Sequence, residues 1–416
     1  MRGERRNFPL LSLNLILWRV GWIFKTESVI MPGFLLNLTG SGAVRGLLPL
    51  ISNLCRSVPQ FLLAHLISSK SVKKWVFFQV SLGLALPWAG MALALKLWPG
   101  RGDLLLILFL ACYALNFTAM GCVTLLSGAM LGKLIRPERR GRLVGASSFV
   151  GCVSAAAAAY LLMPGWLERG LEGYALVFGA TSFFFLLSAL CIPPLEEHRG
   201  GEAKGGGLVK FAAESLGALR SDVNFRRLIC AVLLLQSNSI IFPHYTAYGR
   251  EVLGVKQGSY VLLVIVQNLV NALNSLVMGA VADKRGNRAA LRAAMSLVGL
   301  IPLVALTLGA LPGDVGVKLF PLVYAFIGFA PITLRLTVNL ALELSPPDKH
   351  PAYLGALNLL RITPIFAAPL AGWMIDLLSY EPVFLLASAL IFAGVWMISR
   401  VEEPRFRSHG GRDPSA

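Results

Sequence analysis

The chain has 416 residues, of which 56% are hydrophobic and only 14% charged, and its mean hydropathy is +0.68. These values exclude a water-soluble fold and predict an integral membrane protein. The net charge of +17 would suggest a nucleic-acid partner in a soluble protein, but the basic residues lie in short loops between apolar segments. We therefore expect a lipid bilayer around the protein and no nucleic acid bound to it.

Twelve segments are apolar and long enough to cross a bilayer, since a spanning helix needs about 20 such residues. They predict an all-α membrane protein with twelve transmembrane helices. The predicted spans are 10–37, 44–69, 74–98, 103–131, 141–164, 174–194, 225–250, 257–282, 288–311, 316–344, 350–377 and 380–400.

The distribution of Lys and Arg between the loops predicts the orientation of the chain. An even number of spans places both termini on one side, and most of the 38 basic residues lie there. By the positive-inside rule, both termini are cytoplasmic. We expect a plasma-membrane protein, in the inner membrane if the chain comes from a Gram-negative bacterium. The opposite side carries only seven basic residues, which are Arg45, Lys96, Arg101, Arg169, Arg250, Lys256 and Lys318.

Span 1 is unusual because three ionisable residues, Arg19, Lys25 and Glu27, lie within it, and Arg56 lies within span 2. Each such group costs at least about 2.5–3.5 kcal/mol at the middle of a bilayer, so a partner or a function must compensate. Glu27 and Arg56 both lie near mid-span on consecutive helices, which predicts that they pair. Glu27 is also a candidate proton carrier.

Arg335 in span 10 and Arg361 in span 11 add two more cations at membrane depth. One interpretation is a water-filled cavity in which the buried cations bind the carboxylate or phosphate of a solute. The alternative is structural: Arg19, Arg335 and Arg361 extend toward lipid headgroups, while Glu27 and helix ends balance Lys25 and Arg56.

The longest connection, 195–224, divides the chain into an N-terminal half (1–194) and a C-terminal half (225–402), which a tail (403–416) follows. RPERRGRLVGA (136–146) aligns without gaps on PPDKHPAYLGA, 210 residues later, which indicates a duplication. The connection starts as a glycine-rich linker and ends in a predicted helix on the membrane surface, with a solvated loop as the alternative. Its apolar residues at helical spacing are Leu208, Phe211, Ala212, Leu216 and Leu219.

Polar side chains also occur inside spans 7 and 8. In span 8, Gln267, Asn271 and Asn274 follow at intervals of four and three residues, so they share one helical face. In lipid that face turns inward, where it lines a solute path or bonds to a neighbouring helix. His244 in span 7 is either a proton-linked switch or a packing residue.

The loop after span 8 reads GAVADKRGNR and resembles the signature loop of the major facilitator superfamily, G-x-x-x-D-[RK]-x-G-[RK]-[RK]. Asn287 replaces one of the basic residues, and the corresponding loop after span 2 has Ser68 where the acidic residue stands in the family. The matching residues are Gly279, Asp283, Lys284, Gly286 and Arg288.

This resemblance implies two six-helix bundles that rock about a central site, so that the site opens to each side of the membrane in turn. It also implies that Asp283 and its neighbours form a gate, in which a charge-assisted clasp stabilises one of the two states. The alternative is an ordinary basic turn that only sets the orientation of the chain.

The sequence contains no Walker, HExxH or GxSxG motif, and its six cysteines occur singly without a CxxC. We therefore expect no enzyme activity, no metal and no cofactor. The prediction is a monomeric secondary-active transporter of a small solute, with buried cations that favour an organic anion, coupled to H⁺ or another ion. The alternatives are a proton-coupled exporter of apolar compounds or drugs and a non-transporting membrane sensor or scaffold with the same fold.

Overall fold

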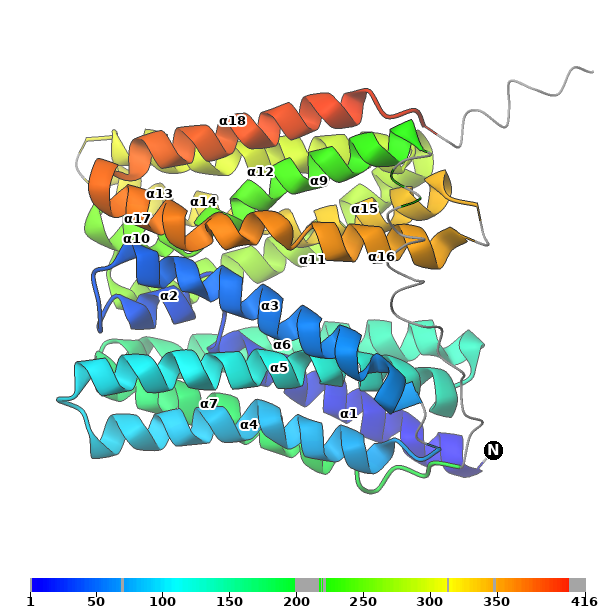
Figure 1. Ribbon diagram of the computed structural model, residues 1–416. Coiled ribbons are helices and arrows are strands. Elements are labelled where there is room, and N and C mark those ends of the chain that lie inside the picture. The colour runs from blue at the N-terminus through cyan, green and yellow to red at the C-terminus, as the bar shows by residue number, and fades with distance from the viewer. Residues whose placement is uncertain are drawn as a thin grey trace, which may run out of the picture. The chain divides into compact units, whose positions relative to one another are not determined.

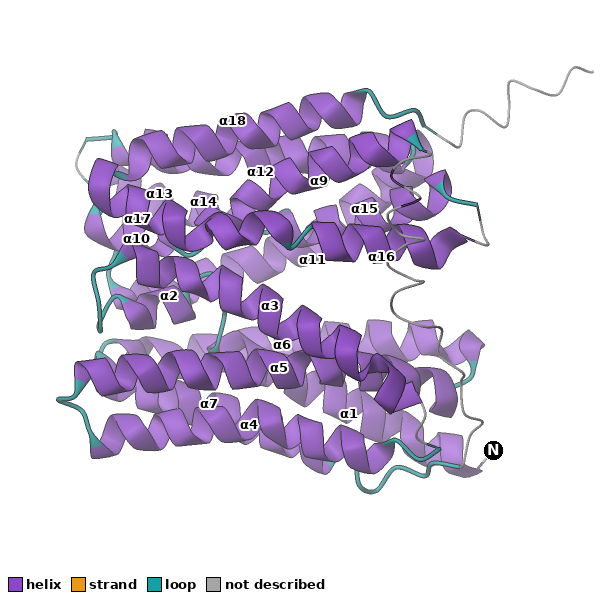
Figure 2. Cartoon of the chain, viewed as in Figure 1, coloured by secondary structure: helices purple, strands orange, loops and turns teal. Residues whose placement is uncertain are grey.

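The computed structural model describes residues 2–68, 71–198, 217, 219, 222–312, 314–346 and 349–403. These residues form helices joined by short loops, and no strand occurs among them (Figure 2). Ten helical stretches are long and apolar enough to cross a membrane, or eleven if the bent pair α9 (Val223–Ile241) and α10 (His244–Glu251) is one span. Helix α3 (Gly42–Ser68) lies where the remaining span is predicted. The predicted all-α class is confirmed.

Two predicted segments lie outside the described residues. The surface helix expected around 208–219 is described only at Gly217 and Leu219, and the tail is described only at Glu403. Both therefore stay predictions.

The described chain forms two compact units, whose helices are labelled in Figure 1. Unit 1 comprises Met1–Gly40, Leu50–Gly205 and Lys256–Ile265. Besides the larger part of α3 and the start of α11, it contains α1 (Arg2–Phe24), α2 (Ile30–Leu35), α4 (Lys74–Leu97), α5 (Gly102–Leu134), α6 (Pro137–Leu167), α7 (Leu171–Leu190) and the 3-10 helix η1 (Gln257–Ser259).

An aromatic cluster fills the core of unit 1 and fixes α2 against the longer helices. Phe34 of α2 is fully buried, and its ring centroid lies 4.9 Å from that of Phe109, 5.1 Å from that of Tyr174 and 5.0 Å from that of Phe178. Trp88 of α4 stacks on Phe178 at 5.0 Å. Offset and edge-on ring pairs of this kind stabilise by about 0.5–1.5 kcal/mol each beyond the burial of their area.

Unit 2 comprises Ser41–Pro49, Gly206–Val255 and Val266–Ala416. Helices α3 and α11 are thus shared between the units, while the division of the chain at its central linker stays a prediction. Besides α9, α10 and the first turns of α3, unit 2 contains most of α11 (Tyr260–Arg285), then α12 (Asn287–Gly309), α13 (Val315–Leu319), α14 (Pro321–Ile327), α15 (Ala330–Leu344), α16 (His350–Leu360), the 3-10 helix η3 (Thr363–Ala367), α17 (Ala368–Leu378) and α18 (Tyr380–Ser399).

The core of unit 2 is also aromatic. Tyr245 and Tyr248 of α10 lie 5.1 and 5.6 Å from Phe384 of α18, measured between ring centroids. Buried next to them, Thr246 and Tyr324 of α14 share a hydrogen bond of 2.7 Å between their hydroxyl groups. These contacts anchor the short helices α10 and α14, which could not stay folded in isolation.

Several predicted spans are interrupted helices. Span 1 breaks at 25–29 between α1 and α2, span 7 bends by 40° between α9 and α10, and span 11 breaks at η3. Pro243 and Pro364 explain the last two breaks, because proline lacks the N–H that a helix requires. Pro59, by contrast, lies inside α3 without interrupting it. Breaks at membrane depth expose polar backbone groups and are tolerated where they line a cavity or a site.

Candidate functional site

The ammonium group of Lys25 lies in the break of span 1, directly after α1 ends. Its side chain is fully buried, and Nζ has no hydrogen-bond acceptor among the described residues. Nζ instead lies 3.7 Å from the ring centroid of Trp22 and 4.4 Å from that of Phe117. Such cation–π contacts stabilise a desolvated ammonium group by about 2 kcal/mol, which is less than the free-energy cost of burying its charge. The ammonium group therefore lacks a full set of partners.

Glu27 and Arg56 are the charged groups that interact electrostatically with Lys25. Tyr113 of α5 is buried and lies close enough to Glu27 and Arg56 to interact electrostatically with both. Arg56 donates to Asn53 at 3.4 Å, and within the described chain it forms no ion pair with Glu27. The described residues therefore do not form the direct Glu27–Arg56 pair expected from the sequence.

Lys25, Glu27, Arg56 and Tyr113, which we call the Lys25 cluster, all belong to unit 1. Gly121 of α5 brings α3 close: a Cβ there would lie 2.1 Å from the Arg56 carbonyl oxygen. The cluster holds two cations and one carboxylate at membrane depth. Two cations beside one carboxylate suit the binding of a solute carboxylate or phosphate. The role of Glu27 in proton coupling stays a prediction.

The other predicted cations lie in different surroundings. Arg19 of α1 is half-buried in unit 1 and donates to Cys152 Sγ at 3.1 Å. Arg335 of α15 is exposed and lies 3.4 Å from Ser275 Oγ within unit 2. Arg361 follows the last residue of α16, at the break of span 11. The predicted substrate-binding residues are thus divided between the two units, and the surroundings of each residue are those within its own unit.

The polar face predicted for span 8 lies on α11 in unit 2. Gln267 and Asn271 are half-buried, whereas Asn274 is 5% exposed and its Nδ2 has no hydrogen-bond acceptor in the described chain. His244, the first residue of α10, is fully buried, and neither ring nitrogen has a hydrogen-bond partner among the described residues. Its role in proton coupling stays a prediction, as does the role of the α11 face.

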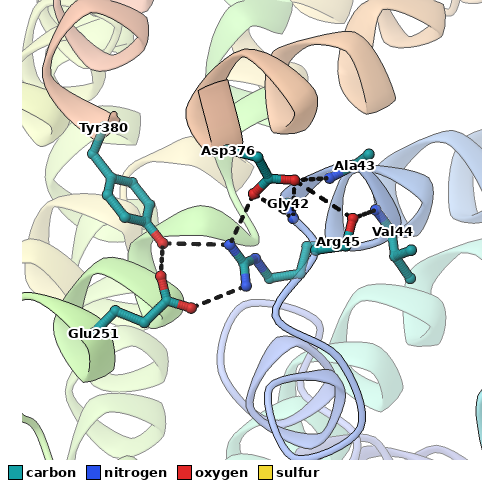
Figure 3. A network of polar contacts seen from close by, with 8 residues as sticks. Gly42, Ala43, Val44, Arg45, Glu251, Asp376 and Tyr380 are labelled. Carbon is teal, nitrogen blue, oxygen red and sulfur yellow. Dashed lines mark hydrogen bonds and ion pairs between the residues drawn. The ribbon is translucent and has the colours of Figure 1, made fainter. Parts of the chain in front are cut away.

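A second charged cluster lies at the start of α3 in unit 2 and was not found by sequence reasoning (Figure 3). Arg45 Nη1 lies 3.1 Å from Glu251 Oε1, and Nη2 lies 3.4 Å from the Tyr380 hydroxyl and 4.0 Å from Asp376 Oδ1. Tyr380 in turn donates to Glu251. The Arg45 side chain is 1% exposed, against 38% for Glu251 and 34% for Asp376. We call these four residues the Arg45 network.

Asp376 also caps α3, because its carboxylate accepts the backbone N–H of Gly42 at 2.7 Å. A carboxylate at this end satisfies a free N–H group and complements the helix dipole. The two helices approach closely: a Cβ at Gly42 would lie 2.4 Å from the Gly372 carbonyl oxygen, and one at Gly46 would lie 2.3 Å from that of Ala368. The spacing of Gly42 and Gly46 is typical of tightly crossing membrane helices.

The signature loop ends α11, but Asp283 does not make the expected contact. Asp283 and Lys284 are exposed, and Asp283 has no hydrogen bond or ion pair with any residue that the structure describes. A Cβ at Gly279 would meet nothing within 4 Å, so no described helix approaches the chain closely there. The clasp at Asp283 therefore stays a prediction.

We expect Asp283→Asn to slow transport at least about fivefold, the lower end of typical coupling between two states, while the yield of folded protein changes less. The measurement is the initial uptake rate in proteoliposomes, divided by the folded fraction from gel filtration. Asp103→Asn, which neutralises an exposed carboxylate at the start of α5, is the control. An unchanged rate for Asp283→Asn would remove the clasp.

The loop is held instead by residues that follow Asp283. Gly286 has a φ of +85°, which favours glycine, and a Cβ there would collide with the Glu403 carboxyl group. Asn287 Nδ2 donates to Glu343 Oε1 at 2.8 Å, and the Arg288 N–H donates to Glu403 Oε2 at 3.1 Å. The start of α12 is thus fixed by two glutamates from the ends of other helices.

Glu197 plays the same part in unit 1. Its side chain is fully buried and accepts the backbone N–H of Lys74, the first residue of α4, at 2.7 Å. Lys133 Nζ, near the end of α5, lies 2.7 Å from Glu197 Oε1. Glu197 follows α7 as Glu403 follows α18, so the capping glutamates support the duplication indicated by the sequence.

Replacing Glu197 by Ala is expected to lower the free energy of unfolding by about 3 kcal/mol, because it leaves a lysine and a helix start without their buried partner. Thermal unfolding in detergent measures the change. Glu196→Ala is the matched control: this neighbour is 42% exposed and pairs with Arg6 at the surface, so its loss should stay within about 0.5 kcal/mol. Equal losses for the two variants would contradict the capping role.

Comparisons with known proteins agree with this architecture. A family model described as Major Facilitator Superfamily matches residues 13–361. A mutant of the nucleoside transporter NupG has a similar structure, with a TM-score of 0.73 and 13% identity, covering 95% of this chain and 99% of that one. No curated protein matches the sequence.

Two further solved structures are similar over 95% of this chain and 98% of theirs. The D-xylose-proton symporter has a TM-score of 0.67 at 15% identity. A bacterial homologue of the iron transporter ferroportin, in the inward-facing state, has a TM-score of 0.67 at 14% identity. At such identities the likeness shows the fold alone.

Proposed function

The chain belongs to the major facilitator superfamily, and on that premise we propose that it carries a small organic anion across a membrane by alternating access. As a member of this family it is a membrane transporter and not an enzyme. The anionic nature of the solute, the coupling to protons, the monomeric state and the plasma-membrane location with both termini in the cytoplasm are parts of the proposal.

The environment of Lys25 carries the proposal. This ammonium group is fully buried without a hydrogen-bond acceptor in the described chain. Glu27 supplies a single negative charge near two cations, Lys25 and Arg56, so one positive charge is left in excess. A solute carboxylate or phosphate would supply the missing negative charge and the missing acceptors together. The break of span 1 supports the same role, because interrupted helices with free backbone groups commonly form the sites of secondary transporters.

Glu27 supports coupling to a proton. While ionised, it neutralises part of the charge of Lys25 and Arg56 and so competes with an incoming anion. A proton on Glu27 removes this competition, so anion and proton would be bound together and released together. The name of the D-xylose-proton symporter describes a carrier coupled to protons. For this chain, Glu27 is the residue that supports such coupling.

The Arg45 network supports a change of conformation. The first turns of α3 belong to unit 2, and the rest of the helix belongs to unit 1. A rocking movement of the halves would therefore bend α3 or release its start from Asp376 and Glu251. We expect the network to be closed in one state and open in the other, as a two-state element should be.

Uptake by proteoliposomes tests the function. The protein would be given labelled carboxylates, phosphate esters, neutral sugars and alkylamines, with and without an outside-acidic pH gradient. We expect uptake of at least one anion, accelerated by the gradient. Uptake of neutral or cationic compounds alone would contradict the anionic solute, and inactivity under every gradient would contradict the transporter.

A further inference from the structure

Unit 1 contains a cavity of about 170 Å³ between α1, α5 and α6. Its walls are mostly apolar, with Leu11 and Leu15 on α1, Leu131 on α5 and Val144 on α6. None of the eleven residues that line it is acidic, and one of them is Arg19. The cavity therefore combines apolar walls with one positive charge.

Two buried polar groups on this wall lack partners. Ser147 is 2% exposed, and its Oγ forms no hydrogen bond within the described chain. The buried Nε1 of Trp18 has no acceptor among the described residues either. Asn14 on the same wall is satisfied, because its Nδ2 donates to Ser188 O at 2.8 Å and to Ser188 Oγ at 2.9 Å. Buried donors without acceptors are costly, so a ligand that brought an acceptor to either group would stabilise the wall.

The guanidinium group of Arg19 also has few hydrogen-bond partners among the described residues. It carries five N–H donors, yet its one hydrogen bond to a described residue runs from Nη2 to Cys152 Sγ at 3.1 Å. A thiol sulfur is a weak acceptor, whereas the planar guanidinium fits a carboxylate with two parallel hydrogen bonds. Since no acidic side chain lines the cavity, a carboxylate entering it would meet no repulsion there.

The volume limits the size of the ligand. An engineered apolar cavity of about 150 Å³ in another protein binds benzene, so this cavity has room for one six-membered ring with a small substituent. The Trp18 ring offers an aromatic surface for such a ring, and it stacks on Trp22 with 5.3 Å between centroids. Because Lys25 Nζ lies over Trp22, the cavity and the Lys25 cluster follow the same face of α1.

We propose that this cavity binds a monocarboxylate with one six-membered ring, whose carboxylate is held by Arg19 and whose ring lies between Trp18 and the apolar wall. The Ser147 hydroxyl and the Trp18 N–H would donate to oxygen atoms of the ligand. The inference rests on the proposed function, because it names the class of anion that the transporter takes: this cavity would hold the anion at one step of its path, and the Lys25 cluster would hold it at another.

Benzoate binding to the detergent-solubilised full chain, measured by titration calorimetry, tests the inference. We expect saturable binding of benzoate, and at least about tenfold weaker binding of benzyl alcohol, which keeps the ring but lacks the charge. Acetate, which keeps the charge but lacks the ring, should bind at least about tenfold more weakly too. Benzyl alcohol that binds as well as benzoate would overturn the proposal, because the cavity would then be an apolar groove.

Two glycines of α5 provide a matched pair of variants. A Cβ at either Gly128 or Gly132 would meet nothing within 4 Å, but Gly128 lines the cavity, whereas Gly132, one turn later, does not. Gly128→Leu should therefore fill the cavity and weaken benzoate binding at least about tenfold, while Gly132→Leu stays within about twofold of the parent. Equal binding by Gly128→Leu and the parent would overturn the proposal.

Arg19→Gln tests the role of the positive charge, independently of the cavity volume. It should weaken benzoate binding at least about tenfold, whereas Arg142→Gln, an exposed position on α6 outside the cavity, should not. Transport separates this inference from the proposed function. If proteoliposomes take up another anion while benzoate shows no saturable binding, the ring-carboxylate site is wrong and the anion transporter stands.

Discussion

Lys25→Met is expected to reduce anion transport by about 100-fold and, at the same time, to raise the stability of the folded protein. Transport falls because the solute loses a buried charged partner, a loss typically worth 2–5 kcal/mol in a binding site, and each 1.4 kcal/mol is about tenfold. Stability rises because a long apolar side chain replaces a fully buried ammonium group that has no acceptor in the described chain. Burying an ion without a full set of partners costs several kcal/mol, so removing this charge should stabilise the folded protein by at least about 1 kcal/mol.

The opposite signs of the two effects make the Lys25→Met test specific. A residue that only supports the fold would lower stability and transport together. Lys96→Met is the control, because Lys96 is an exposed lysine in the last turn of α4 and should change neither property. A Lys25→Met protein that is less stable than the parent, or that transports at the parent rate, would show that Lys25 has a structural role.

Arg45→Gln is expected to lower the free energy of unfolding by about 2–3 kcal/mol. The substitution leaves the carboxylates of Glu251 and Asp376 without the cation between them, and both are only about one-third exposed. Transport should slow as well, because the start of α3 is held in unit 2 by this network. Thermal unfolding in detergent and uptake by proteoliposomes measure the two effects.

Arg101→Gln is the control for Arg45, because Arg101 is an exposed arginine that precedes α5. Its loss should stay within about 0.5 kcal/mol. A double-mutant cycle with Glu251→Gln should give a coupling energy of at least about 1 kcal/mol between Arg45 and Glu251. Equal stability of Arg45→Gln and Arg101→Gln would show that the network contributes nothing to the fold.

Hydropathy predicts the helices of this chain well, because bilayer thickness sets their length and lipid sets their composition. The predicted spans 74–98 and 380–400 agree with α4 and α18 within a residue or two. The break of span 1 was not located in the same way. In the sequence, Pro32 and Gly33 indicate an interruption near residue 32. In the structure, α1 already ends at Phe24, and the packing of the Phe34 ring against Phe109 and Phe178 holds α2 as a separate short helix.

Charge partners were predicted less well, because they depend on contacts between distant helices. From the sequence, Arg45 is only one of the basic residues on the outer side, and nothing in the pattern singles out Asp376. The structure buries Arg45 and places the Asp376 carboxylate on the start of α3. The signal that could have found this site is the pair Gly42 and Gly46 on either side of Arg45, which indicates that a second helix crosses there.

The Lys25 cluster could be predicted in part. Its three charged members, Lys25, Glu27 and Arg56, are found from the sequence, since ionisable residues at membrane depth are costly and therefore conspicuous. Their arrangement with Tyr113 is not, because Tyr113 is an ordinary aromatic residue within an apolar span and periodicity cannot show that it lies near Glu27 and Arg56. Sequence reasoning thus locates the charge, whereas the partner of that charge emerges only from the packing of α3 and α5 around the break in span 1.

Ligand-induced stabilisation tests the central claim most directly. The thermal unfolding temperature of the parent and of Lys25→Met would be measured with a panel of organic carboxylates and phosphates and with neutral analogues of the same size, since a ligand that binds the folded protein raises this temperature. We predict that at least one anion stabilises the parent but not Lys25→Met, and that its neutral analogue stabilises neither. Stabilisation of both proteins to the same extent by every anion, or of the parent by neutral compounds alone, would contradict it.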